Sequence, residues 1–208
     1  VRAKYNAVQP TGQWKMDEGS GATVSDASGN GATGTIHGNA SWIDGRVGKC
    51  LHFDGVDDYV EIPDGAWNTA GPVTFTFWYR YEGGTFPFEH ALTGEVPGAY
   101  AFYGSSGGFD CYDGLVVEHG VNAWPVAGQW NFIAITVTNS EANIYLNGAF
   151  VASTPITGFP KLAGKLHFGA RGSTVVPDSW FQGDLDEFTI YNAALSADEV
   201  LAIYTATN

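Results

Sequence analysis

Short runs of alternating hydrophobic and polar residues recur along nearly the whole chain, with Gly, Asn, Asp and Ser between them. In PVTFTFWYRY, residues 72–81, every second side chain from Val73 onward is large and apolar. Successive side chains of a strand point to opposite faces, so this run has one core face. The opposite face carries Trp78 and Arg80. About 12 to 14 such strands, without helices between them, predict an all-β fold: an antiparallel two-sheet jelly-roll sandwich.

Two local signals mark the turns and the end of this fold. Asn147–Gly148 separates two apolar runs and predicts a hairpin turn. LSADEVLAIY, residues 195–204, predicts one short C-terminal helix, because Ser196 and Glu199 form a capping box at its start. The length of 208 residues suits one domain. We expect residues 1–11 to be a tail or edge strand and residues 12–208 to form the domain.

The formal net charge of −13 excludes two classes of partner. A surface this acidic repels nucleic acids and anionic membranes, and no apolar stretch reaches the roughly 20 residues of a membrane span. Anionic polysaccharides are also repelled, unless some of the nine Lys and Arg residues form a small patch whose positive charge outweighs the overall negative charge. Two cysteines, Cys50 and Cys111, are too few for a disulfide framework.

Six segments, taken together and in order, carry a resemblance to a known family. The chain resembles the LamG-like, concanavalin A-like jelly-roll modules from about residue 12 to about residue 205, and residues 82–121 match least. The resemblance implies two curved sheets, one of them concave. It also implies a module of a larger, secreted or cell-surface bacterial protein that binds carbohydrate or calcium. The segments are WKMDEGSGATVSDASGNGATGTI, GRVGKCLHFDGVDDYVEIP, VTFTFWYR, AGQWNFIAITV, IYLNGAFV and GDLDEFTIYNAALSADEVLAIY.

Acidic residues crowd the start of the last strand, where like charges need a cation or hydrogen-bond donors nearby. Ca²⁺ takes six to eight oxygen ligands from carboxylates, backbone carbonyls and water. The resemblance implies a calcium held by an Asp at this position, which is Asp186, and by groups near the N-terminus. The competing interpretation is that these residues shape turns. The predicted ligands of a structural Ca²⁺ are Asp186, Glu18, Asp26, Asn30 and Gly55.

Aromatic and polar side chains provide a candidate surface for polysaccharide or another glycan. Sugar rings present apolar faces and many hydroxyls, so a few aromatic and hydrogen-bonding groups in a concave site or in rim loops suffice for recognition. The competing interpretation is that these aromatic residues fill the core, as we expect for Trp14 and Trp130. The predicted ligand-binding residues are Trp78, Arg80, Tyr103, Tyr112, Glu118 and Trp124.

No catalytic motif stands out. DLDE, residues 184–187, lacks the leading Glu of the Glu-x-Asp motifs that glycosidases of this fold carry. The Glu89–His90 and Glu118–His119 pairs are neighbours on strands and therefore point to opposite faces. We therefore expect a non-catalytic carbohydrate-binding module. Two alternatives stay open, a small glycan-cleaving glycosidase or lyase, and a structural or adhesion domain that binds proteins.

Overall fold

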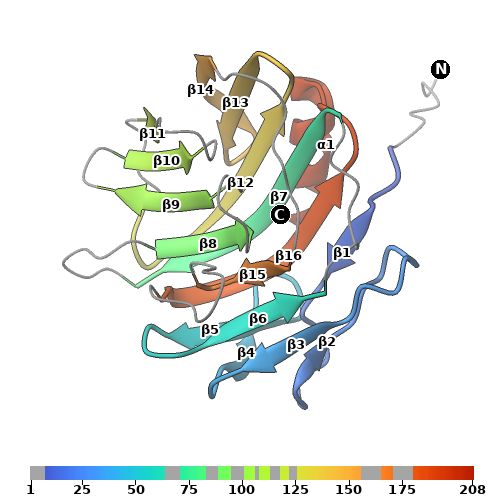
Figure 1. The fold of residues 1–208 in the computed structure, drawn as a ribbon, viewed down its shortest axis with the longest axis vertical. Helices are drawn as coiled ribbons and strands as arrows, with labels where there is room; N and C mark the ends of the chain where they lie inside the picture. The colour runs from blue at the N-terminus through green and yellow to red at the C-terminus, as the bar shows by residue number, and fades with distance from the viewer. Residues whose placement is uncertain are drawn as a thin grey trace.

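Two antiparallel sheets pack face to face in the computed structural model (Figure 1). The structure describes residues 8–63, 71–82, 89–94, 101–105, 108–112, 118–121, 126–155, 165–170 and 180–208. Within 89–94, 101–105, 108–112 and 118–121 it describes the backbone. The arrangement confirms the predicted jelly-roll sandwich.

The first sheet contains the longest strands and the last strand of the chain. Its order is β14 (Ala149–Pro155), β13 (Glu141–Leu146), β12 (Trp130–Val137), β7 (Val73–Tyr81), β16 (Gln182–Tyr191), β5 (Lys49–Asp54) and β4 (Ser41–Asp44), and β1 (Gly12–Trp14) also pairs with β16. The first described strand thus lies beside the last one, with Trp14 opposite Phe188. This pairing brings the start and the end of the domain together.

The second sheet is built from shorter strands and faces the viewer in Figure 1. Its order is β11 (Glu118–Val121), β10 (Gly108–Tyr112), β9 (Ala101–Ser105), β8 (Glu89–Gly94), β15 (Leu166–Phe168), β6 (Tyr59–Ile62), β3 (Gly34–His37) and β2 (Thr23–Val24). Strands that are adjacent in the sheet are often distant in the chain, as β15 between β6 and β8 shows.

The core fills the space between the sheets with aromatic rings. Phe188 stacks on Phe77 at 5.1 Å between ring centroids and on Phe168, from the second sheet, at 4.1 Å. Trp14 meets Phe168 edge to face at 5.2 Å and is fully buried, as predicted. Such offset and edge contacts add to the apolar burial that holds the two sheets together.

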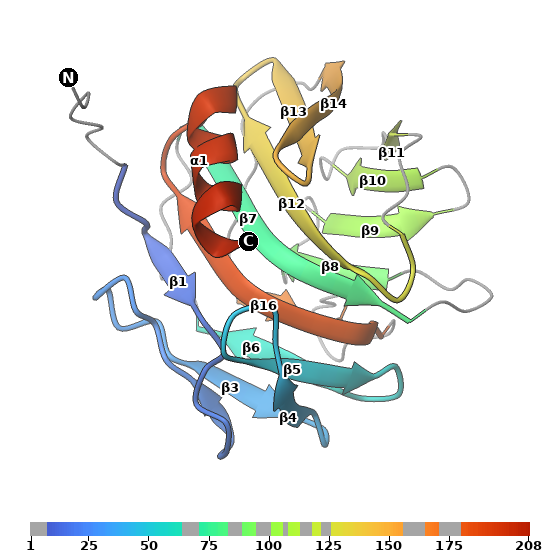
Figure 2. The same cartoon turned by 180° about the vertical axis from the view of Figure 1, so that it is seen from behind.

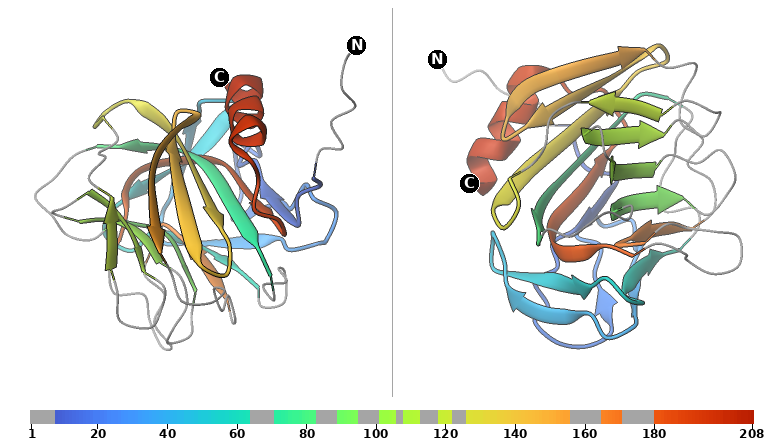
Figure 3. Two further views of the ribbon diagram at one scale, coloured as in Figure 1. Left: turned by 90° about the horizontal axis from the view of Figure 1, so that it is seen from above. Right: turned by 90° about the vertical axis from the view of Figure 1, so that its left-hand side faces the viewer.

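The C-terminal helix, α1 (Ala197–Thr207), lies against the outer face of the first sheet (Figures 2 and 3). It buries a second apolar cluster that includes Trp78, Phe132 and Val200. The indole N–H of Trp78 donates to the Thr207 hydroxyl at 2.9 Å, and the residue is 2% exposed. The expectation that Trp78 stands on an open face is therefore wrong. The strand alternation places it on the outer face, but it does not reveal the helix that covers this face.

The predicted turn and helix start are both confirmed. Asn147 and Gly148 have φ angles of +50° and +78°, which a tight hairpin turn of this kind requires. At the helix start, the Ser196 hydroxyl accepts the Glu199 N–H, and a Glu199 carboxylate oxygen accepts the Ser196 N–H at 2.7 Å. Of the two cysteines, Cys50 is buried and free. The side chain of Cys111 lies outside the described part of the structure.

We predict that Ser196→Ala destabilises the domain by about 1 kcal/mol, because it removes one acceptor from the first turn of α1. A loss of this size lowers the melting temperature of a domain this long by roughly 2–4 °C, which calorimetry resolves. Ser20→Ala, at an exposed loop position, is the matched control and should leave the melting temperature unchanged. Equal melting temperatures for both variants would show that the capping box contributes nothing.

Candidate functional site

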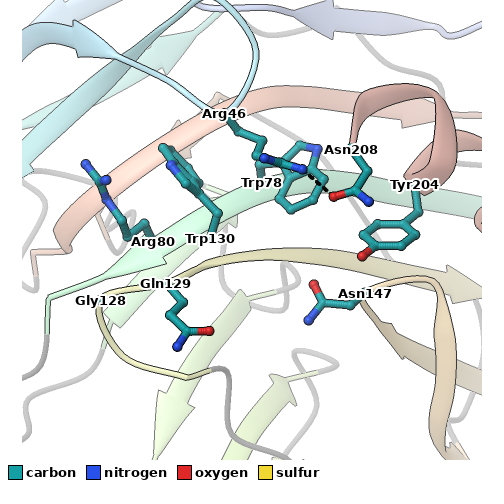
Figure 4. Close-up of a pocket in the computed structure, with 9 residues that line it drawn as sticks. All are labelled: Arg46, Trp78, Arg80, Gly128, Gln129, Trp130, Asn147, Tyr204 and Asn208. Atoms are coloured by element: carbon teal, nitrogen blue, oxygen red, sulfur yellow. Dashed lines mark hydrogen bonds between the residues drawn. The ribbon is translucent and has the colours of Figure 1, made fainter.

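A pocket of about 400 Å³ opens on the outer face of the first sheet (Figure 4). Strands β7 and β12 supply its floor, and the last residues of α1 and the turn between β4 and β5 supply two of its walls. Two of the predicted ligand-binding residues, Trp78 and Arg80, line it. Trp78 belongs to the floor, because its ring is covered by α1 and by Arg46, whose guanidinium carbon lies 4.8 Å from the ring centroid.

Trp130 provides the accessible aromatic surface of the pocket. It lies directly opposite Arg80 in the pairing of β12 with β7, and the Arg80 guanidinium carbon sits 5.0 Å from its ring centroid. Trp130 is half-buried and packs in part against the cluster under α1. The prediction that Trp130 belongs to the core is therefore corrected. Trp130 stands at the first position of β12, where its partly exposed indole lines the pocket.

A buried carboxylate fixes Arg80. Asp184 is fully buried, and one of its oxygens accepts the Arg80 Nε–H at 2.5 Å while the other lies 2.8 Å from His52 Nδ1. The pairings of β4, β5, β16, β7 and β12 place five residues in one row across the sheet, Ser41, His52, Asp184, Arg80 and Trp130. This row is a polar stripe that leads from the β4 edge to the pocket.

Amide side chains supply the polar walls. Gln129 is exposed at the pocket rim, and Asn147 projects from the hairpin turn. The Asn147 carbonyl oxygen accepts the Phe132 N–H at 2.8 Å, which leaves its amide N–H groups for other acceptors. Tyr204 adds a hydroxyl and an aromatic edge from α1. An indole face beside amides and guanidinium groups suits a ligand with an apolar face and many hydroxyls.

Asp186 anchors the turn that closes the pocket. One carboxylate oxygen accepts the Val47 N–H at 2.9 Å, and the other, Oδ1, is buried without a hydrogen-bond partner. Burial raises the pKa of Asp186 to about 7, and the charge of Glu187 adds to this rise. Glu187 itself has a φ of +54° at an irregularity in the pairing of β16 with β7. The acidic residues of this strand therefore have different roles, an ion pair for Asp184 and a turn anchor for Asp186.

The remaining predicted calcium ligands have loop contacts of their own. A Glu18 oxygen accepts the Ser25 N–H at 2.7 Å, and the Asn30 side chain donates to the Thr11 carbonyl at 2.9 Å. Asp26 accepts backbone N–H groups of three residues, Gln13, Ser28 and Ala32. Gly55 occupies a turn with a φ of +80°. Asp17, which is not among the predicted ligands, carries one of the charges that raise the Asp186 pKa.

A second acidic cluster lies on the loop before β6. Oxygens of Asp54, Asp57 and Asp58 lie within 4.8 Å of one another, so the cluster could hold an ion. The buried Asp58 carboxylate accepts the Asp54 N–H at 2.9 Å and the Asn39 N–H at 2.5 Å. These hydrogen bonds account for the loop geometry without a cation.

Three predicted ligand-binding residues lie on the second sheet. Tyr103, Tyr112 and Glu118 belong to β9, β10 and β11 of the second sheet, and Tyr112 is paired with Glu118. Their side chains, like the whole of Trp124, lie outside the described part of the structure. The pocket on the first sheet thus contains Trp78 and Arg80 from the predicted set, together with residues that were not predicted to bind a ligand.

In metal-free buffer, we predict that Asp186→Asn makes stability less dependent on pH. The folded-state pKa of about 7 exceeds the ordinary value of 3.8, so the folded state binds this proton more tightly. The contribution of Asp186 to the free energy of unfolding is therefore complete below about pH 4 and is lost as the pH rises through about 7. Asn keeps the acceptor for Val47 without the charge. Urea titrations with chelator at pH 4.5 and 7.5 test this, and an equal pH dependence in both proteins contradicts it.

The fold and the pocket define a lectin-like jelly-roll module. The model of the concanavalin A-like lectin/glucanases superfamily matches residues 54–201, and the chain belongs to this family. A comparison with curated protein sequences gives no match. No helix within the described ranges is long and apolar enough to cross a membrane.

Solved structures with the same fold share little sequence with this chain. Domain 4 of AbnA, a GH43 extracellular arabinanase from Geobacillus stearothermophilus in complex with arabinotriose, has a TM-score of 0.78 and 20% identity over 96% of this chain and 100% of that chain. The binding domain of Paraclostridial Mosquitocidal Protein 1 has a TM-score of 0.77 and 16% identity over 95% of this chain and 52% of that chain. The ligand binding domain of Botulinum neurotoxin serotype D, in complex with N-acetylneuraminic acid, has a TM-score of 0.72 and 14% identity. This match spans 95% of the present chain and 51% of the neurotoxin chain, so the present chain corresponds to about half of that structure.

Proposed function

We propose that this chain is a non-catalytic carbohydrate-binding module that holds a polysaccharide in the pocket on the first sheet. The observation that carries the proposal is the half-buried Trp130 ring, fixed beside Arg80 and flanked by the Gln129 and Asn147 amides. The indole face accepts the C–H face of a sugar, and the amides and guanidinium groups bind its hydroxyls. The ion pair with Asp184 holds Arg80 in position before any ligand arrives.

The lining of the pocket supports binding without cleavage. Glycoside hydrolysis needs two carboxyl groups about 5 to 10 Å apart across the scissile bond. In the described part of the chain, the nine residues that line the pocket include no carboxyl side chain. The nearest acid in the stripe, Asp184, is fully buried and occupied by Arg80 and His52.

We infer that the module works within a larger, secreted or cell-surface bacterial protein and tethers it to a glycan. Support comes from the relative described as a domain of an extracellular arabinanase and from two relatives that are about twice as long as this chain. Tyr103, Tyr112, Glu118 and Trp124 stay proposed as further glycan contacts, on β9, β10, β11 and the segment that follows.

A structural Ca²⁺ bound through Asp186 is part of this proposal. The donor set suits a hard cation, because Asp186 Oδ1 is a buried carboxylate oxygen without a partner and the carboxylates of Glu187 and Asp17 contribute negative charge nearby. Bound Ca²⁺ would offset the repulsion among these acids and tie β16 to the turn that closes the pocket. Glu18, Asp26, Asn30 and Gly55 stay proposed contributors from the neighbouring loops.

We predict that millimolar Ca²⁺ raises the melting temperature of the domain and that EDTA reverses the change. A ligand at 100 times its Kd adds about 2.7 kcal/mol, which corresponds to roughly 5–10 °C for a domain this long. Asp186→Asn should abolish the effect, and Asp54→Asn, in the second acidic cluster, should preserve it. Loss of the effect in Asp54→Asn instead would place the cation in that cluster.

Affinity gels test the binding proposal. Purified protein is run through gels that contain neutral and acidic polysaccharides, with Ca²⁺ and with EDTA, and each glycan is then assayed for new reducing ends. Retardation without new reducing ends supports a binding module. New reducing ends favour the glycan-cleaving alternative, and the absence of both favours a protein-binding domain.

A further inference from the structure

The pocket is basic in a strongly acidic protein. The chain has nine Lys and Arg residues against 22 Asp and Glu residues, and two of the nine, Arg46 and Arg80, line this one pocket. No Asp or Glu is among the described residues that line it. The nearest buried acids, Asp184 and Asp186, lie behind Arg80 and beneath the turn that carries Arg46. The local charge therefore has the opposite sign to the protein as a whole.

The two arginines differ in how their charge is balanced. Arg80 donates its Nε–H to the buried Asp184, so this pair is close to neutral. Arg46 forms no ion pair with any described residue, and its Nη2 group donates to the neutral side-chain oxygen of Asn208. Among the described residues of the pocket, Arg46 is thus the charged side chain that has no ion-pair partner.

The Arg46 guanidinium is also short of acceptors. Its Nε atom is buried and has no hydrogen-bond partner. Its guanidinium carbon lies 4.8 Å from the Trp78 ring centroid, and the group borders the pocket beside Asn208 (Figure 4). Of the five N–H groups of a guanidinium, one donates to Asn208 and the Nε–H is buried. A remaining Nη N–H group at the pocket would form a short, charge-assisted hydrogen bond with an anionic oxygen of a ligand.

We propose that the pocket selects an acidic sugar, whose carboxylate or sulfate group pairs with Arg46 while the sugar ring lies against Trp130. Gln129 and the free N–H groups of Asn147 bind the hydroxyls on the same ring. A planar guanidinium fork matches the geometry of a carboxylate or sulfate better than the geometry of a single hydroxyl. This inference rests on the proposed glycan-binding function and names the chemical class of the ligand.

The test uses pairs of probes in which one member, called the acidic member, carries more negative charge than the other. The pairs are trigalacturonate with its trimethyl ester, sialyllactose with lactose, and chondroitin sulfate oligosaccharides with their desulfated forms, which keep their carboxylates. Binding is measured by calorimetry at low salt, and the pairs separate a carboxylate from a sulfate ligand. In at least one pair we expect the acidic member to bind roughly 10- to 100-fold more tightly than its partner.

Two variants assign the preference to the pocket. Arg46→Gln should remove the preference for the acidic member. Arg46 also contacts the end of α1, so its replacement could disturb the fold. Gln129→Glu is therefore the second variant. It adds a negative charge at an exposed position on the pocket rim, where the Gln129 side chain has no hydrogen bond in the described structure. It should weaken binding of the acidic member of a pair more than binding of the other member, because the added charge repels the anionic group. Lys49→Gln and Gln182→Glu change the charge equally outside the pocket and should leave the preference intact.

The outcomes separate this inference from the proposed function. If neutral probes bind as tightly as acidic ones, or if the preference survives in both Arg46→Gln and Gln129→Glu, the acidic-sugar inference is overturned and glycan binding stands. If no probe binds, neutral or acidic, and the polysaccharide gels show no retardation, both are overturned. If binding of an acidic probe depends on Arg46 and Gln129 as described, both are supported.

Discussion

Replacing Arg80 with Met should lower the free energy of unfolding by about 3 kcal/mol. The change removes the partner of Asp184, whose carboxylate is fully buried, and leaves it with His52 as its remaining described partner. Breaking a buried ion pair from one side costs about 3–5 kcal/mol, because the remaining charge is left in a poorly solvated place. We expect the lower end of this range, since the Arg80 side chain is 32% exposed. Urea denaturation at pH 7.5 measures the loss.

A double-mutant cycle separates the ion pair from simple packing. Arg80→Met combined with Asp184→Asn should recover most of the loss, because no uncompensated charge remains. Lys49→Met breaks the ion pair with Asp44, whose side chain is 90% exposed, and should change the stability far less, because exposed ion pairs are screened by water and salt. If Arg80→Met and Lys49→Met destabilise the domain equally, Asp184 does not depend on Arg80.

Replacing Trp130 with Ala should weaken glycan binding about 10- to 100-fold while the domain stays folded. The indole is the accessible aromatic surface of the pocket, and loss of a stacked ring and its buried area removes about 1.5–3 kcal/mol of binding free energy. Because Trp130 is half-buried against the cluster under α1, we also expect a smaller loss of stability. Isothermal calorimetry with the retained polysaccharide measures the affinity.

Trp180→Ala is the matched control for Trp130→Ala. Trp180 is also half-buried, but it lies beside Tyr59 of the second sheet, at 6.0 Å between ring centroids. Binding should survive in this variant. If instead Trp180→Ala abolishes binding and Trp130→Ala preserves it, the glycan binds on the second sheet, and the pocket described above is not the site.

Local patterns in the sequence were sufficient to predict most of the fold. The alternation in residues 73–81 identified β7 and its core face, and Asn147–Gly148 and Ser196 with Glu199 identified a hairpin and a helix start. Each of these signals depends on residues a few positions apart, where periodicity, backbone φ and capping act directly. The pairing of β1 with β16 joins residues about as far apart as the domain allows, and no local pattern in the sequence encodes it.

The site depended on contacts between distant residues, and this is why it was predicted only in part. Trp78 lies on the expected face, but a helix 120 positions later in the chain covers it, as its hydrogen bond to Thr207 across 129 residues shows. Trp130 and Arg46 reach the pocket from β12 and the β4–β5 turn, and nothing in their local sequence separates them from ordinary core and turn residues. The register of β7 with β12 brings Trp130 and Arg80 together.

The central claim is that a glycan binds at the pocket on the first sheet, and the indole signals of the seven tryptophans test it most directly. Two-dimensional ¹H–¹⁵N spectra are recorded as the retained polysaccharide, cut to short oligosaccharides, is added. The Trp130 indole and the side-chain amides of Gln129 and Asn147 should shift progressively, whereas the indoles of Trp14 and Trp180 should stay in place. Shifts confined to Trp180 and the backbone of β9 and β10, with Trp130 unmoved, would contradict the claim.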